Sequence, residues 1–499
     1  MNDENYPVII GVAQLTNRPR SLADTIEPME MLERVARQAA EDAGRPALLS
    51  ELDSVQVVNM IGWSYADAPS LLAQRLGAAP THTFYSGIGG ETPQRLINAA
   101  AGDIAAGRRR LVLIAGAEAL ESRRLARKAG ERLPWSRGSP QRIDEDVRPG
   151  FNETEAKHGC TLPIHFYPLF ENAIRAHLGL SLDAHRRRLG ALCSGMTAIA
   201  AANPYAWFPI VRSPEEITTV RPQNRMVCFP YPKLMNAIIE VDQAAAVILT
   251  GSQTARDLGV PEDHWVYLHG AGDATDKWFV SERLCYHSSP AIHAATGRAL
   301  TMAGVGADDI ALFDLYSCFP AAVQLAMDAL GLKPEDPRGV TVTGGLPYAG
   351  GPGNNYVTHS VATMVQRLRQ APDALGLVTG LGWFVTKHSA GVYGARPPSG
   401  PWRRADPAID QAPLDTAPSP PLAEAPEGPA VIETYTVVFG PAGQPERGII
   451  IGRLDSGARF FANPEPDPAI LNAMCCQEFV GRRGRVTQDP PTGRNTFHI

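Results

Sequence analysis

Cysteine, histidine and tyrosine side chains that could carry out covalent chemistry lie in the C-terminal part of this 499-residue chain. Tyr316 and Cys318 follow an apolar stretch that ends at Asp314. His359 comes after a glycine-rich loop, and His388 comes after a second apolar stretch. An imidazole that lowers the pKa of a thiol creates a nucleophilic thiolate, so a Cys–His pair here would predict catalysis. Each residue also has a structural alternative. Cys318 would be a small buried side chain, His359 a hydrogen-bonded residue at a helix start, and His388 a cap on a strand end.

Two glycine-rich turns could bring backbone N–H groups close to a ligand. Gly87, Gly89 and Gly90 precede a predicted helix, and Gly350 and Gly353 belong to the second turn. Glycine allows close approach of the backbone, and amides at a helix start bind anions or a developing oxyanion. We therefore predict an anion-binding or oxyanion site at these turns. The histidines and cysteines show no metal-ligand spacing, and we expect no metal.

Composition excludes several classes of protein. The net charge of -6 gives no support for a nucleic-acid partner. The N-terminal residues are acidic and polar, so we expect no signal peptide. The longest apolar runs are too short to span a membrane. Seven scattered cysteines argue against a disulfide framework, and we expect a cytoplasmic protein.

The elements that hold these loops follow a pattern that occurs twice. The first copy comprises strand 8–13, helix 29–44, strand 52–59, helix 92–106 and strand 111–115. The second copy comprises helix 291–304, strand 308–314, helix 361–369 and strand 375–379. Alternation of strands and helices in both copies predicts two similar α/β halves.

An insertion separates the halves and a different kind of domain follows them. Residues 121–237 contain a polar stretch and then a helical stretch that Asn203-Pro204 should end. Residues 397–429 are rich in Pro, Ala and acids and predict an extended linker. Short β-rich segments with glycine turns between 430 and 499 predict a small antiparallel β-barrel of the OB type.

Residues 84–120 carry a family resemblance. A glycine turn, a helix of small residues, the buried strand Leu111–Ala115 and then Gly116-Ala-Glu118 occur in that order. This order resembles the nucleophile segment of thiolases, closest to the sterol-carrier-protein-2 type. With the C-terminal barrel, the chain is most similar to the thiolase-like protein type 1 group. The resemblance implies a duplicated thiolase fold with a loop domain and an OB-like barrel. The expected domains are an N-terminal half (1–120 and 238–275), a loop domain that contacts coenzyme A (121–237), a C-terminal half (276–396), a linker (397–429) and the barrel (430–499).

The resemblance also places the family's catalytic positions on this chain. The nucleophilic cysteine corresponds to Gly89 or Gly90, and the histidine of the Gly-His-Pro motif corresponds to Gly351. The cysteine of the Cys-x-Gly loop corresponds to Gly380. Tyr316 stands where the sterol-carrier type has the histidine of its His-Asp-Cys-Phe loop. These replacements predict that the chain is not an ordinary 3-ketoacyl-CoA thiolase.

What the resemblance implies for function is an acyltransferase-family protein of lipid metabolism that binds acyl-CoA or another acyl thioester. Coenzyme A would be a ligand or part of the substrate, and no tightly bound cofactor is expected. Contacts with coenzyme A are expected from the cationic residues Arg221, Arg225, Lys233 and Lys387. One alternative is a non-catalytic accessory protein that binds acyl-CoA. Another is a carbon–carbon lyase of the retro-aldol type that uses Tyr316 with Cys318 or His359.

The resemblance leaves the oligomeric state open. Thiolases form dimers through an edge strand of the first half, so the chain could be a homodimer, or a monomer if another segment covers that edge. A partner protein is a third expectation, because thiolase-like proteins with OB-type domains act in complexes.

Overall fold

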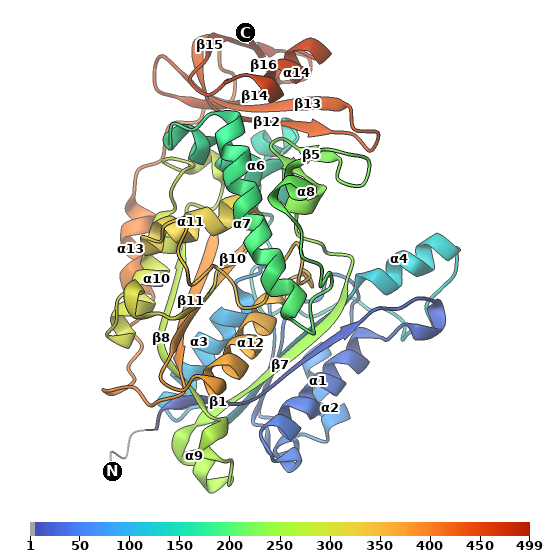
Figure 1. The fold of residues 1–499 in the computed structure, drawn as a ribbon, viewed down its shortest axis with the longest axis vertical. Helices are drawn as coiled ribbons and strands as arrows, with labels where there is room; N and C mark the ends of the chain where they lie inside the picture. The colour runs from blue at the N-terminus through green and yellow to red at the C-terminus, as the bar shows by residue number, and fades with distance from the viewer. Residues whose placement is uncertain (1–4) are drawn as a thin grey trace.

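The core is a nine-stranded sheet flanked by helices, seen in the computed structural model, which describes residues 5–499 (Figure 1). Across the sheet the strands are β3 (His82–Tyr85), β2 (Ser54–Val57), β4 (Leu111–Ala119), β7 (Asp242–Gly251), β1 (Pro7–Asn17), β8 (Val266–Thr275), β11 (Lys387–Gly394), β10 (Leu375–Gly382) and β9 (Leu312–Asp314). A short antiparallel pairing of β1 with β8 joins the two halves. The duplicated α/β core predicted from the sequence is confirmed.

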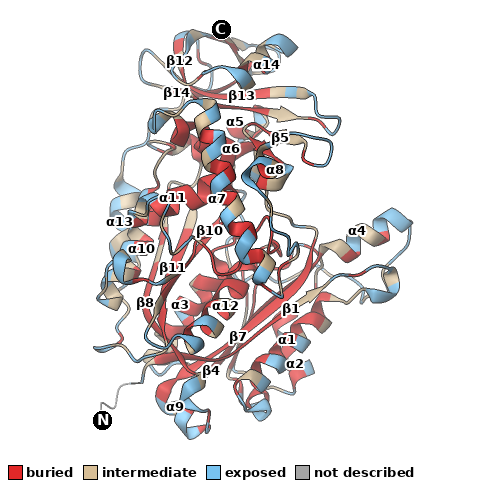
Figure 2. Cartoon of the chain, in the orientation of Figure 1, coloured by how far each residue is buried: buried red, intermediate tan, exposed pale blue. Residues whose placement is uncertain are grey.

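Helices form layers inside and outside the two halves. The helices are α1 (Pro28–Asp42), α2 (Ala68–Leu76), α3 (Thr92–Ala105), α9 (Ser252–Asp257), α10 (Pro290–Ala303), α11 (Pro320–Leu330) and α12 (Tyr356–Gln370). The central helices α3 and α12 contact strands of both halves, whereas α1 and α10 each cover the outer face of one half. Figure 2 shows the consequence, since the sheet and the central helices are mostly buried while the outer helices each expose one face. The glycine turn predicted to bind a ligand therefore leads into the most buried layer.

Short 3₁₀ turns complete the connections. They are η1 (Leu22–Asp24), η2 (Pro46–Glu51), η3 (Lys233–Met235), η4 (Glu262–His264), η5 (Val280–Glu282) and η6 (Ala307–Asp309). No helix among residues 5–499 is both long and apolar enough to span a bilayer.

The insertion between the halves is mainly helical. Its elements are α4 (Leu120–Ala129), α5 (Glu153–Lys157), α6 (Pro163–His177), α7 (Leu182–Ala202), α8 (Pro214–Thr218), β5 (Met226–Cys228) and β6 (Tyr231–Pro232). As predicted, α7 ends just before Asn203-Pro204, because proline cannot continue a helix. The side chain of Ser213 caps α8 by accepting from the backbone N–H of Glu216 at 3.1 Å.

The C-terminal domain is a closed five-stranded barrel. Its strands are β12 (Gly428–Phe439), β13 (Pro445–Leu454), β14 (Arg459–Pro464), β15 (Arg483–Asp489) and β16 (Arg494–His498), with α14 (Pro468–Cys476) beside them. The barrel closes because β12 pairs with both β13 and β15. The sequence predicted an antiparallel barrel, but β14 and β16 pair in parallel, so that part of the prediction is wrong. The expected linker also contains a helix, α13 (Ala408–Thr416), so it is not extended throughout.

Many hydrogen bonds attach the barrel to the rest of the molecule, and two of these contacts matter for the argument below. Cys228 of β5 pairs with Val438 of β12, so the insertion extends the barrel sheet. The guanidinium of Arg459, which is fully buried, donates to Glu433 at 2.8 Å and to the backbone carbonyl of Ser281 at 3.1 Å. In Figure 1 the barrel consequently sits directly above α6 and α7.

The edge strand β3 is covered by the insertion. Asp144 accepts from the backbone N–H of Tyr85 and donates its own N–H to the Tyr85 carbonyl, both at 2.9 Å. Arg142 donates to the carbonyl of Thr83 at 3.1 Å. Backbone groups that an edge strand would offer to a second chain are thus bonded within the same chain.

Candidate functional site

The turn Gly87–Gly90 connects β3 to the buried helix α3. The backbone N–H of Gly87 donates to the Glu145 carboxylate at 2.7 Å. Gly89 has a φ of 154°, a conformation that side-chain-bearing residues rarely adopt, and its N–H donates to Asn354 at 2.9 Å. These two amides of the predicted anion site therefore already have partners within the chain.

Neighbouring groups fill the space beside both glycines. A Cβ added to Gly90 would lie 2.6 Å from the carbonyl oxygen of Leu381 and would also collide with the Tyr316 hydroxyl. A Cβ added to Gly89 would lie 2.7 Å from Nζ of Lys387 and would collide with the Glu91 carboxylate. Neither position has room for a cysteine in this conformation.

A buried ion pair occupies the turn. Glu91 is only 1% exposed, and its carboxylate lies 2.7 Å from Nζ of Lys387. The ammonium group also donates to the carbonyl of Ile88 at 2.6 Å. Lys387, which we predicted to contact coenzyme A, is thus engaged with the turn itself. Glu91 precedes α3, where the helix dipole favours a negative charge.

The glycines at the other two family positions differ in the room around them. A Cβ on Gly380 would lie 2.7 Å from the Cα of Glu91, which is backbone and cannot move freely. A Cβ on Gly351 would have the carbonyl of Ile238 as its nearest neighbour at 3.1 Å, a milder contact. Gly353, in the second glycine loop, donates its N–H to the carbonyl of Gly351 at 2.8 Å.

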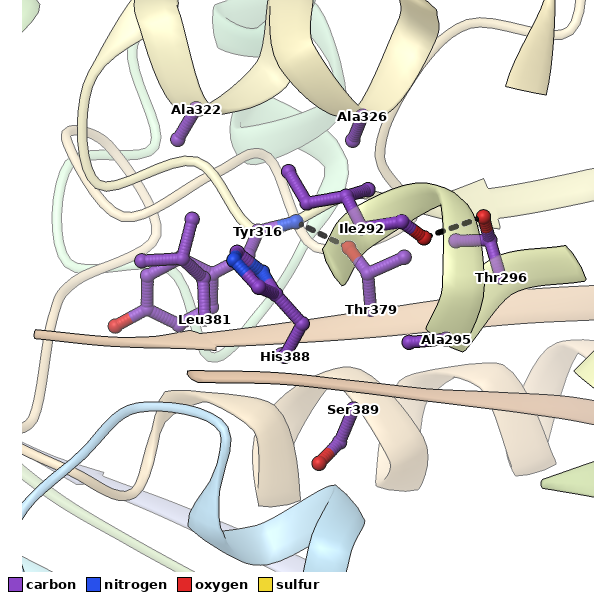
Figure 3. Close-up of a pocket in the computed structure, with 11 residues that line it drawn as sticks. Ile292, Ala295, Thr296, Tyr316, Ala322, Ala326, Thr379, Leu381, His388 and Ser389 are labelled. Carbon is purple, nitrogen blue, oxygen red and sulfur yellow. Dashed lines mark hydrogen bonds between the residues drawn. The ribbon is translucent and has the colours of Figure 1, made fainter. Parts of the chain in front are cut away.

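Tyr316 and His388 line one small cavity with Gly380 and Leu381 (Figure 3). In Figure 3, Ala322 lies on the helix above the cavity and His388 on the strand below it. The volume is about 10 Å³, at the lower limit for a single water molecule. An acyl group does not fit there in this conformation.

The predicted Cys–His pair is not formed. Cys318 is buried between β9 and α11, and burial raises the pKa of its thiol to about 12. His359 lies in α12 with Nδ1 3.0 Å from the Gln14 side chain, and burial lowers its pKa to about 3. Burial likewise lowers the pKa of His388 to about 4, and its Nε2 is 3.1 Å from the carbonyl of Val385. No hydrogen bond joins Cys318 to either histidine within residues 5–499.

His359 instead lines a second cavity of about 10 Å³, together with Gly350. The structure therefore brings Tyr316 and His388 together but places His359 elsewhere. Within residues 5–499, no group of three or more His, Cys, Asp or Glu side chains could hold a metal ion.

A larger cavity lies in the insertion, at its contact with the barrel. Its volume is about 140 Å³, and it is lined by Asn172, Arg175, Leu182, Asp183, His185, Arg186, Leu189, Thr218, Val220, Met226, Phe229, Pro230, Pro232, Met235 and Cys475. The predicted contact residues Arg221, Arg225 and Lys233 belong to the same chain segment and are exposed or half-buried. Sequence patterns did not indicate this cavity, because its wall is assembled from α6, α7, the segment around β5 and the barrel helix α14.

Comparison with known proteins identifies relatives over the whole chain. Residues 411–490 match the thiolase-like protein type 1 additional C-terminal domain. The crystal structure of a monomeric SCP2-thiolase like protein type 1 from Mycobacterium smegmatis is 36% identical, with 100% of both chains covered and a TM-score of 0.86.

More distant matches cover the core. An acetyl-CoA acetyltransferase from Methanocaldococcus jannaschii is 26% identical over 179 residues, which span 36% of this chain and 43% of that enzyme. The solved Ltp2-ChsH2(DUF35) aldolase is 18% identical, with 78% of this chain and 98% of that chain covered and a TM-score of 0.60. At that identity the similarity concerns the fold alone.

Proposed function

The chain belongs to the SCP2-thiolase-like protein type 1 family, and from this premise we propose that it binds an acyl thioester without carrying out the thiolase reaction. The observation that carries the proposal is the filled turn. Glu91, Lys387 and Tyr316 occupy the space beside Gly89 and Gly90, where a thiolase holds its nucleophile.

Thiolase chemistry requires a thiolate at the start of a helix, with an imidazole and a second thiol nearby. Here a carboxylate, paired with Lys387, precedes α3. The thiol of Cys318, two residues after Tyr316, has a pKa of about 12, because burial disfavours its charged form. The histidines are buried and held in the neutral form. These environments favour binding over covalent catalysis.

The cavity in the insertion is the place we assign to part of the thioester ligand. Its walls are mainly apolar, with Arg175 and Arg186 among its lining residues. Lys233 adds an exposed cation in the segment that forms one wall. Apolar walls with a few polar groups are typical of small-molecule sites. Arg175 pairs with Glu478 and Arg186 pairs with Asp183 at 2.9 Å, so exposed Lys233 is the cation that we assign to a phosphate of coenzyme A.

The test is calorimetric titration of the purified protein with acetyl-CoA, acetoacetyl-CoA and a long-chain acyl-CoA, with mass spectrometry of each mixture. We expect binding without product. Val220→Trp, which adds bulk at the half-exposed mouth of the cavity, should weaken binding at least about 10-fold, as expected when a site is sterically blocked. Ile409→Trp, at an exposed position on α13, is the matched control and should bind normally.

Two results would overturn the proposal. Turnover of acetoacetyl-CoA by the unmodified protein would show that a catalytic site exists despite the filled turn. Absence of binding for all three thioesters would show that the chain does not bind this class of ligand.

A further inference from the structure

The turn between β10 and β11 holds a strained backbone conformation. Trp383 has a φ of 56° and Val385 a φ of 59°. They are the two residues other than glycine with positive φ in the part of the chain that the structure describes. The left-handed region is costly for a residue with a Cβ, and most of all for a β-branched valine. Strain of this kind persists only where surrounding contacts enforce it, and it is concentrated at functional sites and switch regions.

A buried arginine enforces the conformation of the turn. Arg283 is 4% exposed, and its guanidinium donates to the carbonyl of Val385 at 2.7 Å and to that of Phe384 at 3.3 Å. It also donates to the hydroxyl of Thr386 at 3.0 Å. The carboxylate of Asp276 lies 3.5 Å from the guanidinium and balances its charge. Because the guanidinium is planar and always charged, these three hydrogen bonds fix the path of the turn.

The insertion also packs against the turn. Tyr167 donates its hydroxyl to the carbonyl of Trp383 at 2.9 Å. The ring of Phe384 stacks on that of Phe166, with centroids 4.0 Å apart. The indole of Trp383 lies against Gly150, since a Cβ at that glycine would be 2.5 Å from a ring carbon. These contacts add to the hydrogen bonds of the arginine and hold both strained residues in place.

The barrel holds the segment that carries Arg283. Arg459, the first residue of β14, is fully buried and donates to the backbone carbonyls of Ser281 at 3.1 Å and Leu284 at 3.4 Å. It donates to the carbonyl of Arg283 as well. Its own charge is paired with Glu433, also in the barrel. Two buried arginines in series therefore connect the barrel to the strained turn.

The turn borders the cavity of Tyr316 and His388. Gly380, Leu381 and His388 line this cavity, and they belong to the two strands that the turn connects (Figure 3). The carbonyl oxygen of Val385 lies 3.1 Å from Nε2 of His388. Relief of the strain at Val385 requires rotation of its backbone, which would withdraw this carbonyl from the imidazole.

We propose that residues 383–385 form a strained lid on this cavity, latched by Arg283 and controlled by the barrel through Arg459. Displacement of the barrel contact lets the turn relax and opens the cavity to solvent. This device lies in the core and does not depend on thioester binding in the insertion.

The experiment measures how fast diethyl pyrocarbonate, which modifies accessible imidazoles, reacts with His388 in the full-length protein, by mass spectrometry of its peptides. His388 is 4% exposed and should react slowly in the unmodified protein. Arg459→Met should raise the rate at least about 10-fold, the factor that corresponds to one hydrogen bond from a charged donor. Arg453→Met is the matched control and should leave the rate unchanged, because its side chain bonds to Glu433 and Gly457, both in the barrel.

A second histidine in the same molecule separates local opening from unfolding. His359 is also buried, at 5% exposed, but it contacts Gln14 rather than the turn. Its rate of modification should not change in Arg459→Met. Thr386→Val removes one acceptor of Arg283 and leaves the barrel intact. It should raise the rate at His388 by a smaller factor, and it keeps the test decisive if Arg459→Met does not fold.

The role of strain is tested by a pair of variants at one position. Val385→Ala and Val385→Gly both lose the buried side chain, but only glycine adopts a φ of 59° without strain. The rate at His388 should therefore be about 5-fold or more lower in Val385→Gly than in Val385→Ala.

Three outcomes would overturn the inference. The first is equal reactivity of His388 in the unmodified protein and in folded Arg459→Met. The second is a parallel rise at His359, which would indicate general unfolding instead of a lid. The third is equal reactivity of the glycine and alanine variants, which would show that strain does not drive the opening.

Discussion

Replacement of Gly90 by cysteine should destabilise the protein rather than create a thiolase. The new Cβ would lie 2.6 Å from the carbonyl oxygen of Leu381 and would also collide with the Tyr316 hydroxyl. Leu381 belongs to β10 and pairs with His388 of β11, so its backbone cannot withdraw without breaking the sheet. Overpacking of this kind costs about 3 kcal/mol, at the upper end of the usual range.

The assays are equilibrium unfolding in urea, thermal unfolding, and mass spectrometry of the protein after incubation with acetyl-CoA. A loss of about 3 kcal/mol should lower the Tm by roughly 3–6 °C in a core of this size. No acyl-enzyme mass should form, because the sulfur cannot reach the helix start in an unstrained position. Gly102→Ala, on the helix α3 that follows the turn, is the control: its Cβ meets only Cδ of Arg404, at 4.0 Å. It should gain about 0.5–1 kcal/mol, since alanine replaces a helical glycine.

A double variant locates the source of the strain. In Gly90→Cys combined with Tyr316→Ala, the ring that meets the new side chain is gone. The double variant should therefore lose less unfolding free energy than the sum of the losses in the two single variants, by about 1 kcal/mol or more. A stable Gly90→Cys protein that accumulates an acetyl group on the new cysteine would refute this reasoning.

Two further perturbations test the buried charges. Arg459→Met leaves Glu433 without its buried partner and should lower the free energy of unfolding by about 3–5 kcal/mol. Limited proteolysis should then cleave the chain faster between core and barrel. The control is Arg453→Met, whose 31%-exposed side chain also pairs with Glu433 and whose loss should cost less than about 1 kcal/mol. His359, with its folded pKa lowered to about 3, takes up a proton only in the unfolded state below pH ~6.5, so its contribution to stability is lost as pH falls through that window. The unfolding free energy of His359→Gln relative to the unmodified protein should thus rise by about 2 kcal/mol between pH 7.5 and pH 5.

Most of the core could be predicted from sequence because its signals are local. The buried runs that became β1 and β4, and the helix that became α7 with its stop at Asn203-Pro204, are set by neighbouring residues. The parallel pairing of β14 with β16 has no such signal, since α14 and β15 intervene in the chain. The helix α13 was missed because a Pro- and Ala-rich composition also describes an extended linker, and α13 itself contains Pro413.

The arrangement of the candidate site depended on contacts between distant residues. Glu91 is an acid at a helix start, a local signal, but its partner Lys387 comes from the far end of the core. Nothing near His359 in the sequence indicates that it contacts Gln14 rather than Cys318. Sequence patterns thus located the loops, whereas the fold determined which side chains meet.

The position of α14 links the barrel to the cavity in the insertion. Cys475 on this barrel helix forms part of the wall that is otherwise built from α6, α7 and the segment around β5. A molecule that binds the outer surface of the barrel and moves α14 would reshape that wall, and a ligand in the cavity would bias the barrel by the same free energy. Binding to the C-terminal domain could therefore change the affinity of the cavity for its ligand through α14.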